Sequence, residues 1–382
     1  MLFSLHIDTA VSWRGGQSQV LQTVMGLRAR GHRAVLVAHP KGELARRAHE
    51  GHDLIRLAPL HEVDFAAGLR LSRVLRELTP AVVHAHDPHA VSMTAMALSM
   101  MGRAARPAFV VSRRVDFHLK QNSFSRWKYK LADCIVCSSN AIRAMVVGDG
   151  VPDDRAVTVY EGVDCDRIAA IPAADVHKEF WLTPHVPVVG NVAALVAHKG
   201  QRYLIDAAPA IIHARPDAQI LIFGEGELRP QLQRQIKHLG LDLNVRLVGF
   251  QPNVLALLKS LDLFVMSSVT EGLGTSILDA MASSKAVVAT DAGGMPEAVD
   301  DGVTGLIVPA QKPAPLAAAI LRLLDDTALR AQMGQAGLQR VRAQFSVDRM
   351  VDQTLAVYQR VVDTPPSAGT PNPPPAGPIR TD

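Results

Sequence analysis

Directly after the short apolar run Leu263–Met266, the chain reads Thr270-Glu271-Gly272-Leu273-Gly274-Thr275-Ser276-Ile277-Leu278-Asp279-Ala280-Met281-Ala282. The apolar run predicts a buried strand, and the segment from Ser276 to Ala282 predicts a helix. The two glycines allow the backbone to approach a ligand closely, and the N–H groups of Thr275 and Ser276 lie at a helix N-terminus, where they stabilise a diphosphate. The stretch therefore predicts a phosphate-binding loop. An ordinary helix start with first-turn acids is the alternative.

The same alternation of short apolar runs and amphipathic helices continues on both sides of this stretch, which is typical of parallel α/β domains. In the first half, strands are predicted at Leu2–Ile7, Ala34–Ala38, Ala81–His86, Phe109–Ser112, Ile135–Ser138 and Val157–Tyr160. In the second half, they are predicted at Val188–Val192, Ile220–Phe223, Val245–Val248, Leu263–Met266, Ala286–Ala289 and Gly305–Val308. We therefore expect an α/β fold of two Rossmann-like domains that face each other across a cleft.

The domain boundaries follow from the same pattern. The first domain is expected at residues 1–166 and the second at 188–346, with the proline- and alanine-containing segment 167–187 as the linker. A last helix is expected at 347–363. The proline-rich tail at 364–382 has the composition of a disordered end.

Composition limits the classes of function. The 382 residues are 48% hydrophobic and 20% charged, which is enough to bury a sizeable core. Aromatic residues make up 4% and the net charge is +4, so neither base stacking nor a strong basic field favours a nucleic-acid partner. The first residues lack a cationic signal region, and no run of about 18 apolar residues exists. We expect a cytoplasmic protein that can lie against the inner face of a membrane.

Two further features each have a functional and a purely structural interpretation. Cys134 and Cys137 form a C-x-x-C inside a predicted strand, which favours structural burial over a redox pair or a zinc site. The segment from Lys120 to Lys130 is basic, with Lys120, Arg126, Lys128 and Lys130 interrupted by Phe124 and Trp127. It could lie on an anionic membrane, or it could be a solvated helix face.

Glu271, Asp279, Ala280-Met281-Ala282, Gly293-Gly294 and Glu297 follow one another in an order that resembles the retaining glycosyltransferases of family four. That family has the GT-B fold and carries a Glu-x7-Glu pattern, Ala-Met-Ala and a Gly-Gly turn. Val188–Pro309 resembles its donor domain, also through Lys199-Gly200 and Gly224-Glu225-Gly226. The first domain resembles its acceptor-side domain through Gly15-Gly16 and Glu161-Gly162-Val163-Asp164.

The resemblance implies a role for each matching residue. Glu271 matches the acid that contacts the donor sugar and is the implied catalytic residue. The implied donor-binding residues are Gly15, Gly16, Lys199, Glu225, Gly274, Thr275, Ser276 and Asp279. Among these, Lys199 and the loop from Gly274 to Ser276 hold the diphosphate, and Asp279 holds the ribose. No metal and no cofactor are implied, because the nucleotide sugar is a co-substrate.

The sequence departs from the family at two donor positions and in the first domain. Asp279 replaces a Glu and Ala194 replaces an Arg, so Lys199 is expected to be the main cation on the diphosphate. On the acceptor side, the candidates are His84 and His86, at the end of one predicted strand, and Arg113, Arg114 and Asp116, directly after the next. For the two histidines, metal binding, substrate contact and a structural role stay open.

The sequence thus predicts transfer of a sugar, with retention of configuration, from a nucleotide sugar to a glycan or lipid-linked acceptor. Cell-surface polysaccharide or lipopolysaccharide synthesis is the expected setting. A non-catalytic glycosyltransferase-like binding partner is the alternative, because Ala194 and Asp279 depart from the family. A dinucleotide oxidoreductase is disfavoured, since no G-x-G-x-x-G follows the first strand.

Overall fold

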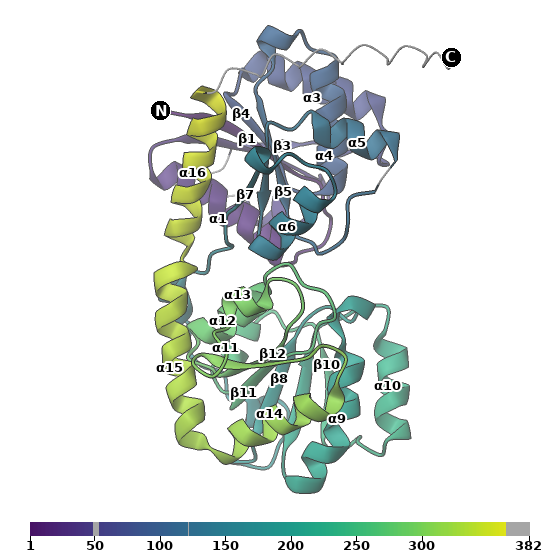
Figure 1. Cartoon of the computed structure of the whole chain (residues 1–382), viewed down its shortest axis with the longest axis vertical. Coiled ribbons are helices and arrows are strands. Elements are labelled where there is room, and N and C mark those ends of the chain that lie inside the picture. The colour runs from purple at the N-terminus through teal and green to yellow at the C-terminus, as the bar shows by residue number, and fades with distance from the viewer. Residues whose placement is uncertain (49–52, 121, 364–382) are drawn as a thin grey trace, which may run out of the picture.

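The computed structural model describes residues 1–48, 53–120 and 122–363, and the predicted tail at 364–382 lies outside these described residues. Two domains lie one above the other in Figure 1, each built on one sheet. Within the described residues, the upper, N-terminal domain contains seven strands: β1 (Phe3–Asp8), β2 (Arg33–Ala38), β3 (Leu54–Arg56), β4 (Val82–Ala85), β5 (Ala108–Arg113), β6 (Cys134–Cys137) and β7 (Ala156–Thr158). The lower, C-terminal domain contains six: β8 (Val188–Val192), β9 (Gln219–Phe223), β10 (Val245–Gly249), β11 (Leu263–Met266), β12 (Val287–Thr290) and β13 (Gly305–Val308).

Both sheets are parallel and follow the same strand order. The orders are β3-β2-β1-β4-β5-β6-β7 and β10-β9-β8-β11-β12-β13. In each sheet the order in which successive strands are added reverses at the first strand, so β1 lies between β2 and β4, and β8 lies between β9 and β11. In the first sheet, β1 pairs with β2 and β4, with Ser4 opposite Ala34 and Val82. Ligands of open parallel sheets bind at the carboxyl ends of the strands next to this reversal point. The predicted α/β fold with two Rossmann-like sheets is confirmed.

Helices cover the sheets because the strands are apolar on both faces. Strand β12, for example, is buried at all four positions. The N-terminal domain carries α1 (Gly15–Ala29), α2 (Glu43–Arg47), α3 (Phe65–Leu78), α4 (Pro88–Ser99), α5 (Ser123–Lys130) and α6 (Asn140–Gly148). The C-terminal domain carries α9 (Gln201–Ala214), α10 (Arg229–His238), α11 (Val254–Leu258), α12 (Thr275–Ala282), α13 (Met295–Ala298), α14 (Pro313–Asp325) and α15 (Thr327–Gln344). Among the described helices, none is both long and apolar enough to cross a bilayer.

The segment expected to be a linker contains local structure that packs on the second domain. It includes most of α7 (Cys165–Ala170) and all of α8 (Val176–Glu179). Ile168, Val176 and Leu182 are buried in the same cluster as Phe264 of β11. Burial of these apolar side chains stabilises the segment against the C-terminal domain.

The chain passes between the domains twice, at residues 159–164 and 345–346, which we call the first and second crossing segments. They are hydrogen-bonded to each other: the N–H of Val163 donates to Phe345 (2.8 Å), and the N–H of Val347 donates to Val163 (3.3 Å). A β-carbon on Gly162 would lie 2.7 Å from the carbonyl oxygen of Ser346, so glycine is needed for this close approach. The two crossings therefore form one joined hinge region.

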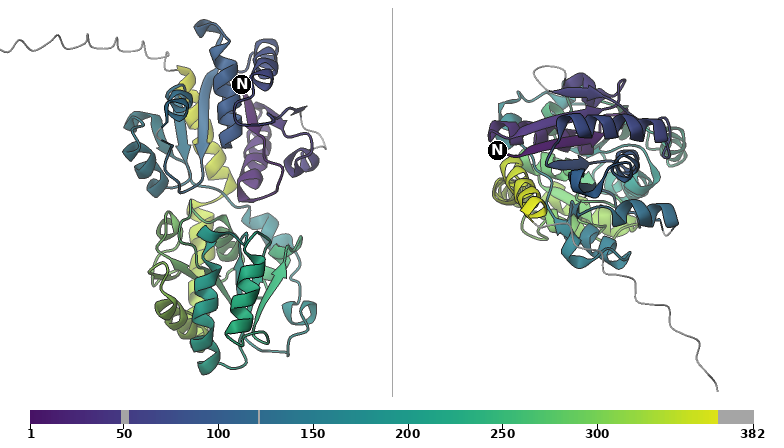
Figure 2. Two further views of the ribbon diagram at one scale, coloured as in Figure 1. Left: turned by 90° about the vertical axis from the view of Figure 1, so that its right-hand side faces the viewer. Right: turned by 90° about the horizontal axis from the view of Figure 1, so that it is seen from above.

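The last helix, α16 (Val347–Asp363), returns to the first domain. It runs beside the N-terminal domain in Figure 1 and lies next to the start of the chain when seen from above in Figure 2. Val351, Val357 and Tyr358 of α16 pack with Val24 of α1 and Val82 of β4. The helix was expected from the sequence, but the domain that it covers was not.

Candidate functional site

The predicted phosphate-binding loop connects β11 to α12, as the sequence indicates. Gly274 precedes the helix with φ 88°, a left-handed conformation that favours glycine, and Thr275 begins α12. Gly15 begins α1 of the other domain, and a β-carbon on Gly15 would clash with the hydroxyl of Thr275. Two helix N-termini, from α1 and α12, therefore face each other at close range. Their unpaired N–H groups and dipoles make this position favourable for an anion.

Lys199 and Glu271 form an ion pair beside this loop. Lys199 ends a short 3-10 turn after β8, and Glu271 precedes α12. The Nζ of Lys199 lies 2.5 Å from Oε2 of Glu271, and the two side chains are 19% and 11% exposed. The hydroxyl of Ser268 also donates to this carboxylate, at 3.0 Å. The structure thus brings together the two residues for which the sequence predicted sugar contact and diphosphate contact.

Asp279 lies on α12, one turn beyond the loop. Its side chain is half-buried, and burial raises its pKa to about 7, with nearby Glu161 raising it further and Arg167 opposing the shift. Glu161 on the first crossing segment is buried, and burial raises its pKa to about 7 as well. The acid that the family resemblance assigns to the ribose therefore sits in an environment that disfavours its charge.

Asp279→Asn is expected to stabilise the protein at alkaline pH. Because folding raises the pKa from 3.8 to about 7, the stability that Asp279 contributes is complete below pH 3.8 and is lost as the pH rises through about 7. Asn cannot ionise, so at pH 8 the variant should gain at most about 4 kcal/mol relative to wild type, and much less at pH 4. Thermal melting of both proteins at the two pH values measures this. A gain that is equal at both, or none at pH 8, would contradict the shift.

Glu225 lies apart from the Lys199–Glu271 pair. It follows β9, is exposed, and pairs with Arg229 (3.0 Å) on the same domain. Its backbone carbonyl accepts a hydrogen bond from Leu195 in the loop after β8, at 3.0 Å. Glu225 therefore lies in the loop after β9, and its carboxylate contacts Arg229 at the start of α10.

On the opposite domain, Arg113 and Arg114 point in different directions. Arg113 is buried and donates to the carbonyl oxygen of Phe117 in its own loop, so its side chain holds the loop. Arg114 turns toward the first crossing segment, where its Nε lies 3.2 Å from Oε1 of Glu161. Its carbonyl oxygen packs so tightly on Gly272 that a β-carbon there would clash. Of the two predicted arginines, Arg114 is the one that contacts the predicted phosphate-binding loop between β11 and α12, which we call the donor loop.

Asp116 and Phe117 also reach the C-terminal domain. A β-carbon on Gly293 would lie 3.1 Å from Oδ2 of Asp116. The Phe117 ring contacts His198 edge-on, with centroids 5.6 Å apart. His198 directly precedes Lys199, so the loop after β5 faces the donor residues.

Glu297 joins the two domains at a second place. Its carboxylate accepts hydrogen bonds from the N–H groups of Asn140 and Ala141 at the start of α6, both at 2.8 Å, and from the Tyr160 hydroxyl at 2.8 Å. A carboxylate at a helix N-terminus is favourable because of the unpaired N–H groups and the dipole. The sequence contains Glu297 as part of a family pattern, but its partners could not be identified there.

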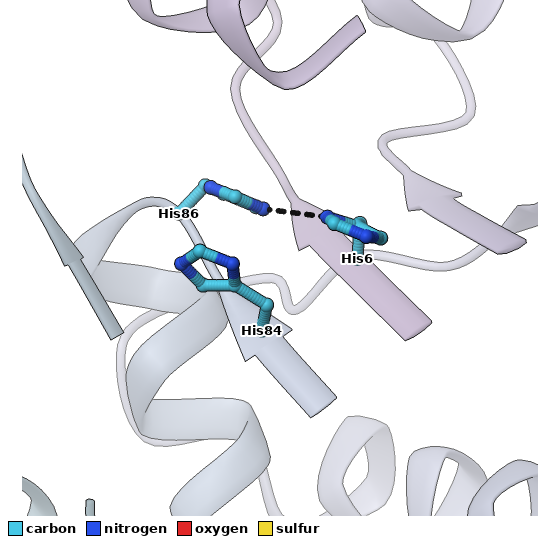
Figure 3. A group of neighbouring side chains, drawn as sticks. All are labelled: His6, His84 and His86. Carbon is cyan, nitrogen blue, oxygen red and sulfur yellow. Dashed lines mark hydrogen bonds between the residues drawn. The ribbon is translucent and has the colours of Figure 1, made fainter. Parts of the chain in front are cut away.

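His84 and His86 lie inside the N-terminal domain, where their side chains are only 2% and 7% exposed. His6 of β1 joins them, which the sequence did not indicate. Figure 3 shows the three rings together, with the hydrogen bond of 3.1 Å between Nε2 of His86 and Nδ1 of His6. Burial and the nearby Arg114 lower the pKa of each histidine, to about 3 for His6. All three are therefore neutral near pH 7, and their burial places them behind Arg114 instead of at a substrate surface.

The three histidines offer one nitrogen each within 4.8 Å of one another, a spacing that a metal site would need. Their orientations favour hydrogen bonding. The rings of His84 and His86 lie 3.9 Å apart by centroid and are tilted by 33°, and the nitrogens of His84 are engaged in hydrogen bonds. His84 bonds to Tyr358 (2.6 Å) and Ser112 (2.8 Å). A shared metal would require these bonds to break.

The basic segment of α5 is partly committed to internal contacts. Lys128 is buried and pairs with Glu62 at 2.7 Å. Phe124 and Trp127 are half-buried and lie 5.5 Å apart by ring centroid. Lys128 is therefore not available to an anionic surface, which corrects that part of the membrane interpretation.

Comparison with known families gives matches over both halves of the chain. The family described as Glycosyltransferase Family 4 matches residues 13–167, and Glycosyl transferases group 1 matches residues 177–340. The lipopolysaccharide core biosynthesis glycosyltransferase LpsD of Rhizobium meliloti is 30% identical over 296 residues, which are 77% of this chain and 79% of that protein. The α-D-kanosaminyltransferase of Streptomyces kanamyceticus is 33% identical over 177 residues, and the match spans about half of each protein, 46% of both.

Solved structures agree with the fold. The crystal structure of Anabaena HepE in complex with UDP superposes with a TM-score of 0.80 at 21% identity and covers 94% of this chain and 100% of that one. That likeness, together with two parallel sheets of matching strand order, confirms the α/β GT-B fold.

Proposed function

Because this chain belongs to the GT-B glycosyltransferases that join a family 4 N-terminal half to a group 1 C-terminal half, we propose that it is a nucleotide-sugar-dependent enzyme. In this proposal it transfers the sugar to a glycan or lipid-linked acceptor with retention of anomeric configuration. The observation that carries it is the Lys199–Glu271 pair, which lies beside the facing N-termini of α1 and α12.

The donor diphosphate would lie at the α12 N-terminus. Backbone N–H groups of Thr275 and Ser276, the dipole of α1 beginning at Gly15 and Gly16, and the ammonium of Lys199 would meet its charge. Charge on the diphosphate grows as the glycosidic bond breaks, so these fixed groups stabilise the transition state more than the ground state. In this mechanism the protein itself supplies the positive charge.

Glu271 would hold hydroxyl groups of the donor sugar. Its carboxylate is already oriented by Ser268 and Lys199, which suits an acceptor of hydrogen bonds more than an attacking nucleophile. We therefore propose that the acceptor hydroxyl attacks from the face that the diphosphate leaves. The reaction would pass through a front-face displacement or a short-lived ion pair, and either course retains configuration.

The acceptor would enter beside the loop after β5. Asp116 and Phe117 of this loop approach Gly293 and His198 of the donor domain, so a hydroxyl held there would be near the sugar. The similarity to LpsD, a lipopolysaccharide core biosynthesis glycosyltransferase, supports a lipopolysaccharide or other cell-surface glycan as the acceptor class.

Turnover of the donor tests this proposal against the alternative of a non-catalytic binding partner. The purified protein is incubated with UDP-, GDP-, ADP-, CDP- and TDP-sugars, and the released nucleoside diphosphate is measured by chromatography. The anomeric configuration of the product is read by NMR. We expect turnover of at least one donor with retention. Binding of a nucleoside diphosphate without any turnover would favour the non-catalytic partner.

We infer that the protein associates peripherally with the inner face of a membrane through the N-terminal domain. Leu60 and Phe65 are 93% and 66% exposed, and the exposed Arg70 and Arg73 follow on α3. Exposed apolar side chains near cations suit an anionic lipid surface.

Phe65→Ser is expected to weaken binding to vesicles that contain phosphatidylglycerol by about 10- to 150-fold, because burial of a Phe side chain contributes roughly 1.5–3 kcal/mol. Leu243→Ser is the matched control, since Leu243 is 80% exposed on the other domain. Co-sedimentation with vesicles measures both. Equal losses in the two variants would contradict docking through α3.

A further inference from the structure

Arg114 occupies a junction between three parts of the molecule. Its Nε forms an ion pair with Oε1 of Glu161 on the first crossing segment (3.2 Å), its Nη1 donates to Nδ1 of His86 (3.2 Å), and its carbonyl oxygen packs on Gly272 of the donor loop. The side chain is 18% exposed. A single residue thus touches the hinge region, the buried histidines and the loop that is proposed to hold the donor.

The hydrogen bonds below Arg114 have a defined direction. A guanidinium can only donate, so Nδ1 of His86 must accept and its Nε2 must carry the proton. That proton is donated to Nδ1 of His6, which leaves Nε2 of His6 to donate to Ser4 at 3.0 Å. Arg114 therefore selects one tautomer for each of these neutral histidines.

The same network reaches α16. Ser112 lies 3.1 Å from His86 and 2.8 Å from His84, and His84 lies 2.6 Å from the hydroxyl of Tyr358. Tyr358 is fully buried. Since α16 follows the second crossing segment, the side chain of Arg114 is connected to both crossings: directly through Glu161 and indirectly through Tyr358.

A small cavity adjoins this junction. It has a volume of about 20 Å³ and is lined by Arg114, Glu161, Ser138 and His84 among others. The hydroxyl of Ser138 is buried without a hydrogen-bond partner among the described residues. A space of this size with several polar walls accommodates about one water molecule. Arg114 therefore borders a small, partly polar cavity between the first crossing segment and the buried histidines.

We propose that Arg114 is a positioning residue for sugar transfer, which fixes the donor loop at Gly272 by tying it to the hinge region through Glu161 and to the buried histidines through His86. This inference rests on the proposed function for its catalytic consequence. Lysine cannot replace the planar fork that bridges two partners, although it keeps the charge. A misplacement of about 1 Å can reduce the rate about 100-fold without a direct contact to the reacting atoms.

Arg114→Lys is therefore compared with wild type and with Arg215→Lys. Arg215 likewise bridges two acids, Asp217 and Asp325, but on the C-terminal domain and outside this network. We expect kcat to fall about 10- to 100-fold in Arg114→Lys, while the dissociation constant of the nucleoside diphosphate stays within about threefold. Arg215→Lys should change neither. A kcat of Arg114→Lys equal to that of wild type would overturn the proposal.

Two Glu161 variants supply a second test in case Arg114→Lys does not fold. Glu161→Gln keeps the size of the side chain and an oxygen that faces Nε of Arg114, so its kcat should stay within about threefold of wild type, whereas Glu161→Ala removes both and should lose about 10-fold or more. Equal rates in the two variants would overturn the positioning role.

Hydrogen exchange separates this inference from the proposed function, since it needs no donor. In Arg114→Lys, the N–H groups of Asn140 and Ala141, which bond to Glu297 of the other domain, should exchange faster than in wild type and in Arg215→Lys. Unchanged exchange there overturns the coupling even if transfer is observed. Faster exchange in a protein that turns over no donor would support the coupling between Arg114 and the Glu297 contact, and it would contradict only the proposed function.

Discussion

Glu271→Gln is expected to lower sugar transfer by at least about 100-fold, the loss typical when one fixed transition-state contact is removed. The carboxylate sits beside the α12 N-terminus, 2.5 Å from Lys199, and is 11% exposed. Gln keeps the size of the side chain and can still accept from Ser268, but it is a weaker partner for a sugar hydroxyl than a carboxylate. Steady-state kinetics of the variant with the donor identified above measures the effect.

Glu227→Gln is the matched control, because Glu227 is an exposed acid on the same domain and lies after β9. It should transfer sugar like wild type. Melting curves of both variants should lie close to that of wild type, since neither side chain belongs to an apolar core cluster. Transfer by Glu271→Gln above about a tenth of the wild-type rate, where a loss of 100-fold or more is expected, would contradict the assigned role.

Lys199→Ala is expected to lower kcat/KM for the donor by about 10- to 150-fold. A hydrogen bond to a charged group contributes roughly 1.5–3 kcal/mol, and each 1.4 kcal/mol is about tenfold. Part of the loss should appear in kcat, because the diphosphate gains charge as the sugar leaves. Lys237→Ala, a substitution of an exposed lysine on α10, should leave the donor kinetics unchanged.

Ala194, five residues before Lys199, is a position at which a second substitution could restore activity to Lys199→Ala. Ala194 lies in the loop after β8, where its carbonyl oxygen accepts from Gln201 at 2.9 Å. Ala194→Arg should restore part of the activity of Lys199→Ala if the new guanidinium reaches the same phosphates. If Lys199 only stabilised the turn before α9, its removal would lower the melting temperature and leave donor kcat/KM within about threefold of wild type.

Much of the fold was predictable because its signals are local. Of the thirteen strands in the part of the chain that the structure describes, all but one coincide with an apolar run in the sequence. The exception is β3 (Leu54–Arg56), in which Arg56 leaves only two consecutive apolar residues. The loop before α12 was also predictable, since its glycines and the following helix are contiguous in the chain.

What the sequence could not indicate depends on contacts between distant segments. His6 and His86 are 80 positions apart, and Tyr358 lies 274 positions after His84. Nothing in the pattern of α16 says which domain it covers, because an amphipathic helix fits any apolar surface of suitable shape. The pairing of Arg114 with Glu161 likewise depends on how the first crossing segment leaves its sheet, which only the folded arrangement determines.

The central claim is that the N-terminus of α12, with Lys199, holds the diphosphate of a nucleotide sugar. Isothermal titration calorimetry with UDP, GDP, ADP, CDP and TDP tests it most directly, using wild type and Lys199→Ala. At least one of these nucleotides should bind wild type, and Lys199→Ala should bind that nucleotide about 10- to 150-fold more weakly. Binding of equal strength to the two proteins, or no binding of any of the five to wild type, would contradict the claim.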